Sequence, residues 1–248
     1  MLEAWFYTLT SVLVVSIVSL VGVIILGISS SKLKVVLIYL LAFSAGALFG
    51  DVFLHIIPEM GEEGFSLVSS IWILAGFLLF FVIEKFVHWQ HCHMPITKNH
   101  IHPFAYTNLI GDGFHNFLDG LIIAAGYLVS LPIGIATTLA VIFHEIPQEI
   151  GDFGVMIHGG FSKGKALFLN FVSALLAVLG AVIGLILSTR IEYIADILLP
   201  LAAGGFIYIA GADLIPELHK DVGIRKAFLQ LIALLAGIGV MALLLLLE

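Results

Sequence analysis

Long apolar runs alternate along the chain with short polar connections. Each run is close to the ~20 residues that a helix needs to cross the hydrocarbon core of a bilayer. The pattern predicts an all-α integral membrane protein with a single transmembrane domain over residues 1–248. The expected spanning helices cover residues 4–28, 34–57, 67–87, 104–128, 132–157, 164–187, 194–215 and 225–247.

Composition supports a membrane setting. Apolar residues make up 61% of the chain and charged residues 11%, which excludes an ordinary soluble surface. The first apolar run lacks a basic leader and is long enough to span, so we expect it to be retained. The single cysteine, Cys92, excludes an internal disulfide. We expect the lipid bilayer as a partner and no nucleic acid.

The basic residues sort the connections onto two sides of the membrane. Because basic loops face the cytoplasm, the side that holds nine of the ten basic residues is predicted to be cytoplasmic, and only Arg190 lies opposite. Both termini then face away from the cytoplasm, and in a prokaryote the membrane would be the cytoplasmic one. The nine are Lys32, Lys34, Lys85, Lys98, Lys163, Lys165, Lys220, Arg225 and Lys226.

Two segments of the chain resemble each other. "AGALFGDVFLHIIPE" at 45–59 aligns without gaps with "AGGFIYIAGADLIPE" at 203–217. The two helices run in opposite directions through the membrane, which is typical of the inverted repeats of secondary transporters. We therefore predict a 3+2+3 arrangement, with helices 1–3 and 6–8 around helices 4 and 5. The alternative is two Gly/Ala-rich helices that both end at a proline for unrelated reasons.

The fourth and fifth predicted helices carry matching polar frames, "HNFLDG" at 115–120 and "HEIPQEIGD" at 144–152. Residues four apart share one face of a helix, which places His115 above Asp119 and His144 above Gln148. Asn116 and Glu145 follow the two histidines at the same position in each frame.

Acidic residues inside these two helices need a neutralising partner. An ionised acid at mid-bilayer costs ~2.5–3.5 kcal/mol, and neither helix contains Lys or Arg. A bound cation is the natural partner, since imidazole with carboxylate and amide oxygens suits Zn²⁺, Fe²⁺ or Mn²⁺. Zinc is the leading candidate, as one ion or two. The alternative is a packed helix pair whose polar groups satisfy one another. The acids are Asp112, Asp119, Glu145, Glu149 and Asp152.

The paired motifs resemble the signatures of the ZIP (zinc/iron-regulated transporter-like) family, particularly its histidine-rich branch. The resemblance implies a homodimeric transporter without a prosthetic group that moves Zn²⁺, and also Cd²⁺, Fe²⁺ or Mn²⁺, into the cytoplasm. It further implies an elevator-type movement around a binuclear metal site. Carried over residue by residue, the metal ligands are His115, Asn116, Asp119, His144, Glu145 and Gln148.

One residue departs from that branch, which usually has histidine where this chain has Gln148. An amide supplies neither an imidazole nitrogen nor a charge, so we expect weaker bridging and a preference shifted toward harder ions. Polar residues elsewhere are candidates for the transport pathway, and the resemblance places entrance and exit near the first two and the last of them. The candidates are Asp51, His55, Asp112, Glu149, Asp152 and Asp213.

A polar segment at 88–103 is predicted to be a cytoplasmic loop between the third and fourth helices. Its histidines would handle metal ions transiently, and a solvated linker explains the segment equally well. These histidines are His88, His91, His93, His100 and His102.

Two other functions compete with transport. "HEIPQ" at 144–148 begins like the H-E-x-x-H motif of metalloproteases, but the second histidine is missing and Pro147 lies inside the motif. An intramembrane metal-dependent hydrolase is therefore disfavoured, and we expect no enzyme activity. A metal sensor would bind the same ions without transporting them.

Overall fold

The computed structural model describes residues 2–21, 30–62, 64–88, 103–191, 193–220 and 223–247. Helices connected by short turns form these parts of the chain, and no strand occurs in them. The predicted histidine-bearing loop lies almost wholly outside the described residues. The α-helices are α1 (Leu2–Val18), α3 (Ser30–Asp51), α4 (Ile57–Glu62), α5 (Leu67–His88), α6 (Pro103–Val129), α7 (Leu131–His158), α8 (Lys163–Ala174), α9 (Leu176–Ser188), α10 (Ala195–Tyr208), α11 (Ile215–His219) and α12 (Ile224–Leu244).

Short helices of other types extend these elements. Two are 3₁₀ turns, η1 (Ser19–Val21) and η4 (Leu245–Leu247), and two are π turns, η2 (Val52–Ile56) and η3 (Ile209–Leu214). Through η2, α3 continues into α4, and through η3, α10 continues into α11. The second and seventh helices were expected to end at residues 57 and 215, directly before Pro58 and Pro216. The structure instead carries each of them past its proline.

Six helical stretches in the described parts of the chain are long and apolar enough to cross a membrane, so the protein is a multi-pass integral membrane protein. Helices α6 and α7 are equally long but are not among the six, because they carry the acidic and histidine residues that lower their hydropathy. The six are Leu2–Val21, Val36–Gly61, Leu67–Lys85, Lys163–Ser188, Ala195–His219 and Ile224–Leu244.

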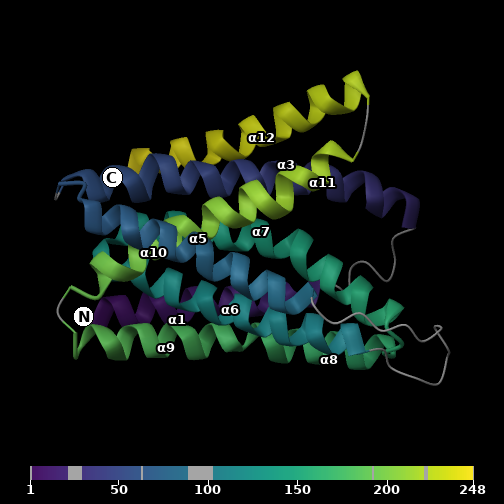
Figure 1. Cartoon of the computed structure of the whole chain (residues 1–248), viewed down its shortest axis with the longest axis horizontal. Helices are drawn as coiled ribbons and strands as arrows, with labels where there is room; N and C mark the ends of the chain where they lie inside the picture. Colours follow the sequence, from purple (N-terminus) through teal and green to yellow (C-terminus); the bar gives the residue numbers. More distant parts are fainter. Residues whose placement is uncertain are drawn as a thin grey trace.

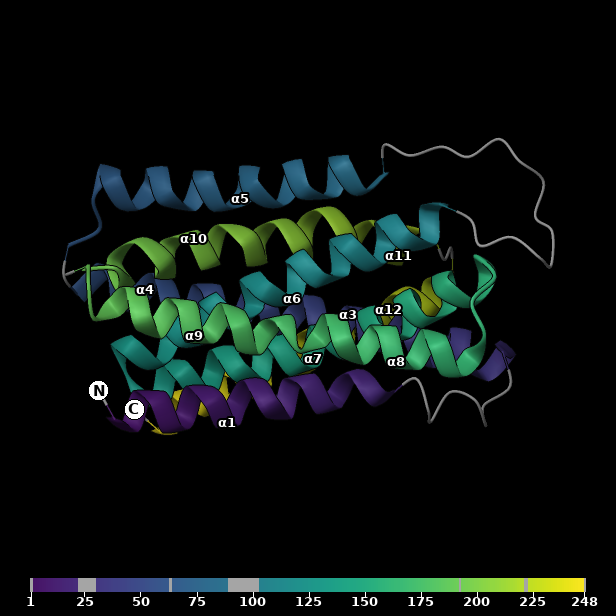
Figure 2. The ribbon, with the colours of Figure 1, turned by 90° about the horizontal axis from the view of Figure 1, so that it is seen from below.

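The helices pack as two bundles that lie against each other (Figures 1 and 2). In one bundle, α6 packs along α7 and α9, and α1 covers all three. In the other, α12 packs along α3, and α5 along α10. The bundles meet mainly where α3 contacts α7 and where α6 contacts α10 and α5. Figure 1 marks both termini at the same end of the molecule.

Glycines at matching positions of the proposed repeat allow close helix contacts. A Cβ atom at Gly46 of α3 would lie 2.0 Å from the carbonyl oxygen of Leu234 in α12, and one at Gly204 of α10 would lie 1.9 Å from that of Ile73 in α5. Only glycine fits at such distances. The two helix pairs are therefore packed in the same way.

The π turns also occupy matching positions in the two repeat segments. In η2 the Ile57 amide donates to the carbonyl of Val52, and in η3 the Ile215 amide donates to that of Ala210. Each turn directly precedes an Ile-Pro pair. Proline lacks an amide proton and clashes with the carbonyl four residues earlier, so a widened turn lets the helix continue. The correspondence supports the predicted repeat.

Candidate metal centre

Helices α6 and α7 present the two polar frames to each other because a very short connection joins them. Ser130 alone lies between them, and its hydroxyl caps α7 by accepting a hydrogen bond from the Ile133 amide at 3.3 Å. His115 and His144 lie at nearly equal distances along the chain from this connection. Antiparallel packing therefore places the two histidines side by side.

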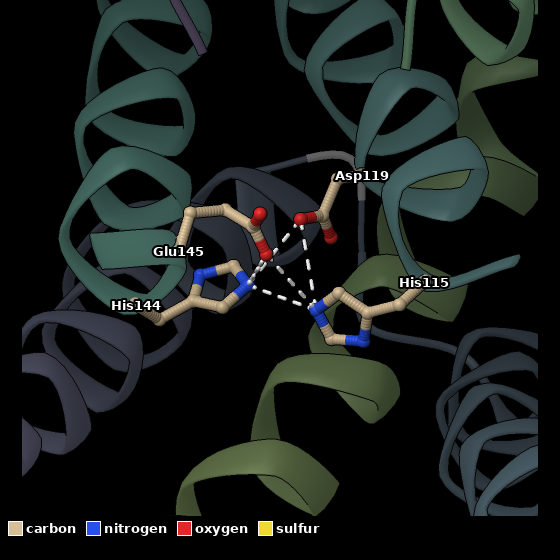
Figure 3. A group of neighbouring side chains, drawn as sticks. All are labelled: His115, Asp119, His144 and Glu145. Atoms are coloured by element: carbon tan, nitrogen blue, oxygen red, sulfur yellow. Dashed lines mark hydrogen bonds and ion pairs between the residues drawn. The ribbon is translucent and has the colours of Figure 1, made fainter. Parts of the chain in front are cut away.

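Four side chains from these helices converge on one point (Figure 3). Nε2 of His115 lies 3.1 Å from Nε2 of His144 and 3.7 Å from Oδ2 of Asp119. Nε2 of His144 lies 3.3 Å from Oδ2 of Asp119, and each histidine Nε2 lies 3.5 Å from Oε1 of Glu145. Among the described residues, these four form the group of histidine and carboxylate side chains whose ligand atoms all lie within 4.8 Å of one another.

These separations match a tetrahedral zinc site. Zinc binds histidine nitrogen and carboxylate oxygen at about 2.0–2.2 Å, so the corners of its tetrahedron lie about 3.4 Å apart. The five edges that include a histidine Nε2 range from 3.1 to 3.7 Å. A single ion at the centre would therefore reach all four ligand atoms with only small side-chain movements.

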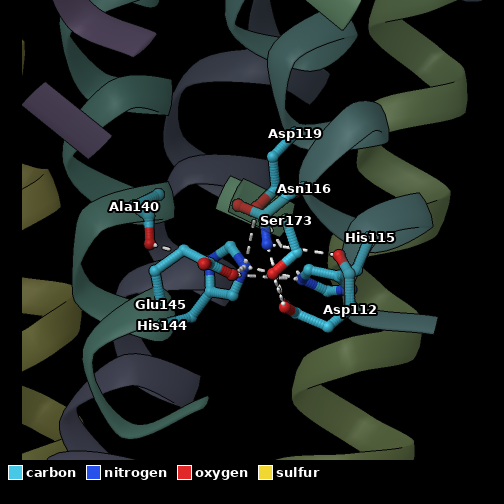
Figure 4. A network of polar contacts seen from close by, with 8 residues as sticks. All are labelled: Asp112, His115, Asn116, Asp119, Ala140, His144, Glu145 and Ser173. Atoms are coloured by element: carbon cyan, nitrogen blue, oxygen red, sulfur yellow. Dashed lines mark hydrogen bonds and ion pairs between the residues drawn. The ribbon is translucent and has the colours of Figure 1, made fainter. Parts of the chain in front are cut away.

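A backbone carbonyl orients the His144 ring. Nδ1 of His144 lies 3.1 Å from the carbonyl oxygen of Ala140, as Figure 4 shows. The carbonyl can only accept a hydrogen bond, so Nδ1 carries the proton and Nε2 presents its lone pair to the cluster. Ring orientation by a second hydrogen bond is usual for histidines that bind metal ions.

The cluster is shielded from solvent. His144 and Asp119 are fully buried, Glu145 is 1% exposed, and His115 is 11% exposed. Aromatic rings from the other bundle cover both histidines: Phe80 of α5 lies 5.6 Å from the His115 ring, and Phe206 of α10 lies 6.0 Å from the His144 ring.

The other two of the six predicted ligands, Asn116 and Gln148, are not part of this group of four. Asn116 is buried, and its Nδ2 donates to Oδ1 of Asp112 at 2.8 Å, which leaves its own Oδ1 without a hydrogen-bond partner. Gln148 lines a cavity beside His115.

That cavity, of about 120 Å³, extends from the cluster between the two bundles. Its walls carry acids from both bundles: Asp112 and Asp152 on one side, Glu84 and Asp213 on the other. Tyr208, also in the wall, donates a hydrogen bond to Glu84. Glu84 was not among the residues predicted from the sequence, although it is the one acidic residue in the apolar stretch 67–88. The aromatic covers, Phe80 and Phe206, carried no sequence signal that separated them from ordinary core residues.

The predicted pathway residues Asp51, His55 and Asp213 lie at the π turns. Asp51 directly precedes η2 and is fully buried, and both of its carboxylate oxygens lack a hydrogen-bond partner. His55 lies within η2, with Nε2 3.0 Å from the carbonyl oxygen of Met241. Asp213 lies within η3. The histidines at 91, 93, 100 and 102 lie outside the described residues, as does the side chain of His88.

The sequence matches the family described as "ZIP Zinc transporter" over residues 2–103 and 90–245. This match covers nearly the whole chain. The chain belongs to the ZIP zinc transporter family. The resemblance drawn from the two motifs is thereby confirmed, and because this is a family of transporters, the hydrolase alternative is not favoured.

Several proteins named as ZIP zinc transporters are similar to this chain. Zinc transporter ZIP13 of Pongo abelii is 37% identical over 222 residues, which cover 82% of this chain and 65% of that protein. Zinc transporter ZIP13 of Danio rerio is 30% identical over 308 residues, covering 98% of this chain and 87% of that protein. Zinc transporter zipt-7.2 of Caenorhabditis elegans is 31% identical, covering 96% of this chain and 64% of that protein.

Proposed function

We propose that this ZIP protein transports divalent metal ions, Zn²⁺ foremost, toward the cytoplasm by way of the cluster on α6 and α7. The observation that carries the proposal is the convergence of two imidazole nitrogens and two carboxylate oxygens at tetrahedral spacing inside a membrane protein. The two carboxylates would balance the charge of a divalent ion. The family and the names of the relatives support the same cargo.

The ligand types decide which ions fit. Imidazole with carboxylate suits Zn²⁺ and Cd²⁺ and also admits Fe²⁺ and Mn²⁺. Gln148, in the cavity wall next to His115, would add an amide oxygen where the histidine-rich branch usually has an imidazole, which favours the harder ions of this set.

A second ion has potential ligands beside the first. Each carboxylate of the cluster has one oxygen that lies outside the group of four and lacks a hydrogen-bond partner, Oδ1 of Asp119 and Oε2 of Glu145. Oδ1 of Asn116 is also unpaired and buried. We propose that the two carboxylates bridge a binuclear centre, with Asn116 and Gln148 completing the second position.

The topology follows from the basic residues. We propose eight spans, with α6 and α7 crossing the bilayer inside the molecule because their polar faces pack against the other helices. The cavity beside the cluster includes Asn108 near the start of α6 and Asp152 near the end of α7. By the charge rule these ends are cytoplasmic, so the cavity would be the inner exit.

The two bundles suggest how the ion moves. Helices α6 and α7 carry the proposed metal ligands, and α1, α8 and α9 pack with them, whereas α3 packs mainly with α12, and α5 mainly with α10. We propose that the first bundle slides against the second as an elevator, in a homodimer as the family resemblance implies. The buried Asp51 and His55 at η2 would serve the outer route, and Asp213 at η3 the inner one.

Zinc flux into liposomes tests this function. The purified protein should pass Zn²⁺ or Cd²⁺ down a gradient, and His115→Ala or Glu145→Ala should abolish the flux, because each removes a ligand of the cluster. His158→Ala is the matched control, since His158 lies at the exposed end of α7, and it should leave the flux unchanged. Normal flux in both cluster variants would refute the assignment. Metal binding without flux in the unaltered protein would favour a sensor.

A further inference from the structure

Two buried acids and a half-buried one lie between the histidine cluster and the proposed cytoplasmic end of the cavity. Asp112 comes from α6, and Glu149 and Asp152 come from α7. Asp112 is 5% exposed and Glu149 is fully buried. No Lys or Arg occurs in either helix, and among the described residues none forms an ion pair with these acids. Their charge therefore lacks a protein cation to balance it.

Amide and hydroxyl donors hold one or both oxygens of each acid. Nδ2 of Asn108 donates to Oδ1 of Asp152 at 2.8 Å. Nδ2 of Asn170, on α8, donates to Oε2 of Glu149. Asp112 accepts from Asn116 and from the Ser173 hydroxyl, as Figure 4 shows. The donors fix the carboxylates in place, and being neutral, they leave the negative charge uncompensated.

The remaining oxygens have no donor. Oε1 of Glu149, Oδ2 of Asp152 and Oδ1 of Asn170 are buried and lack a hydrogen-bond partner. All three are acceptors, and the Glu149 and Asn170 side chains are fully buried. A buried acceptor without a donor costs about 1–3 kcal/mol. A cation within reach of such an oxygen would supply the missing partner.

Space for a cation lies beside two of the three acids. Asp112 and Asp152 line the same cavity of about 120 Å³ as His115 and Gln148. A water molecule occupies about 30 Å³ in the liquid, so an ion with a few waters fits. The ligand atoms of these acids are spaced more widely than those of the histidine cluster. An ion that keeps some of its water matches that spacing.

We propose that Asp112, Glu149 and Asp152, with the carbonyl oxygen of Asn170, form a second cation site that offers only oxygen ligands. Oxygen ligands select hard divalent ions such as Mn²⁺ rather than soft ones. The role of the site rests on the proposed transport function: it receives the ion as it leaves the histidines. Whether the site exists is tested by metal binding, without a transport assay.

Mn²⁺ titration monitored by electron paramagnetic resonance tests the site in the full-length protein in detergent. In the background Asp119→Asn/His144→Ala, which disables the histidine cluster, one Mn²⁺ per chain should still bind. Adding Asp152→Asn or Glu149→Gln should weaken that binding at least tenfold, because each removes a charged ligand while keeping the side-chain shape. Asp196→Asn is the control, since Asp196 lines a different pocket near the start of α10, and it should leave the affinity unchanged.

Two results would refute the proposed oxygen site. One is a background variant that binds no Mn²⁺, and the other is an affinity that changes less than threefold in both oxygen-site variants. Size-exclusion chromatography checks folding, and if Asp152→Asn does not fold, Glu149→Gln decides. Because binding is measured at equilibrium, a failure of zinc flux in liposomes leaves this result standing, so the two proposals fail separately.

Discussion

Gln148 is the side chain on which the metal preference of the proposed centre depends. It lies in the cavity wall next to His115, at the position where the histidine-rich branch of the family usually has histidine. An amide oxygen is a harder ligand than an imidazole nitrogen. We therefore propose that this residue shifts the preference between zinc and manganese relative to that branch.

Replacing Gln148 by histidine should therefore shift the preference toward zinc. We expect Gln148→His to raise the affinity for Zn²⁺ relative to Mn²⁺ about tenfold, since the new imidazole nitrogen favours the softer ion. Competition binding, in which Zn²⁺ displaces Mn²⁺ from the purified protein, measures the ratio. If the ratio of the two affinities does not change, Gln148 is not a ligand of the bound ion.

Residue spacing predicted which side chains converge in the candidate centre. The four-residue spacing of His115 and Asp119 placed them on one face of a helix, and the structure brings them to the adjacent pair His144 and Glu145. Spacing could not reveal that Asn116 bonds to Asp112, because that depends on side-chain rotation. Nor could it place Glu84, which lies on a helix distant in sequence and reaches the cavity only through tertiary packing.

Glycine contacts fix the distance between the helices that carry and support the site. A Cβ atom at Gly120 of α6 would lie 1.9 Å from the carbonyl oxygen of Ala177 in α9, and backbone cannot yield as a flexible side chain does. Contacts of this kind within each bundle would keep that bundle rigid while the bundles move relative to each other.

We expect Gly120→Ala to destabilise the fold by about 2 kcal/mol, in the range found for overpacked cores, because α6 and α9 must separate. Gly151→Ala in α7 is the control, since an added Cβ there meets nothing within 4 Å and alanine favours a helix by up to about 1 kcal/mol. Thermal unfolding in detergent measures both. Equal midpoints for the two variants would show that the α6–α9 contact is not close.

At the element level, apolar length predicted the helices well but not their irregularities. The expected helices at 104–128 and 132–157 differ from α6 and α7 by one residue at each end. The π turns before Pro58 and Pro216 were missed, because a proline late in an apolar run indicates a helix end as readily as a widened turn. Whether the helix ends or forms a widened turn depends on tertiary packing, which the local sequence does not determine.

At the scale of the whole molecule, the interface between the bundles is where an elevator must slide. Phe43 of α3 and Phe143 of α7 meet across this interface with ring centroids 4.9 Å apart. Within one bundle, the Ser16 hydroxyl of α1 donates to the carbonyl of Ala174 in α8 at 2.9 Å. A cross-link at the first contact would block movement between the bundles, whereas a cross-link at the second would lie within one bundle.

Cross-linking these contacts tests the elevator proposal. In a Cys92→Ser background, oxidation of a Phe43→Cys/Phe143→Cys pair should lower zinc flux more than tenfold, and reduction should restore it. Oxidation of a Ser16→Cys/Ala174→Cys pair should leave the flux unchanged, because both residues move together. Full flux through the oxidised pair that joins α3 to α7 would rule out sliding at this interface.

We propose that His115, Asp119, His144 and Glu145 together bind the transported ion. The most direct measurement is anomalous diffraction at the zinc edge from crystals soaked in Zn²⁺. This ligand assignment predicts a peak about 2.0–2.2 Å from the two Nε2 atoms and from one carboxylate oxygen of each acid. Zinc bound elsewhere, with these four side chains hydrogen-bonded only to one another, would contradict it.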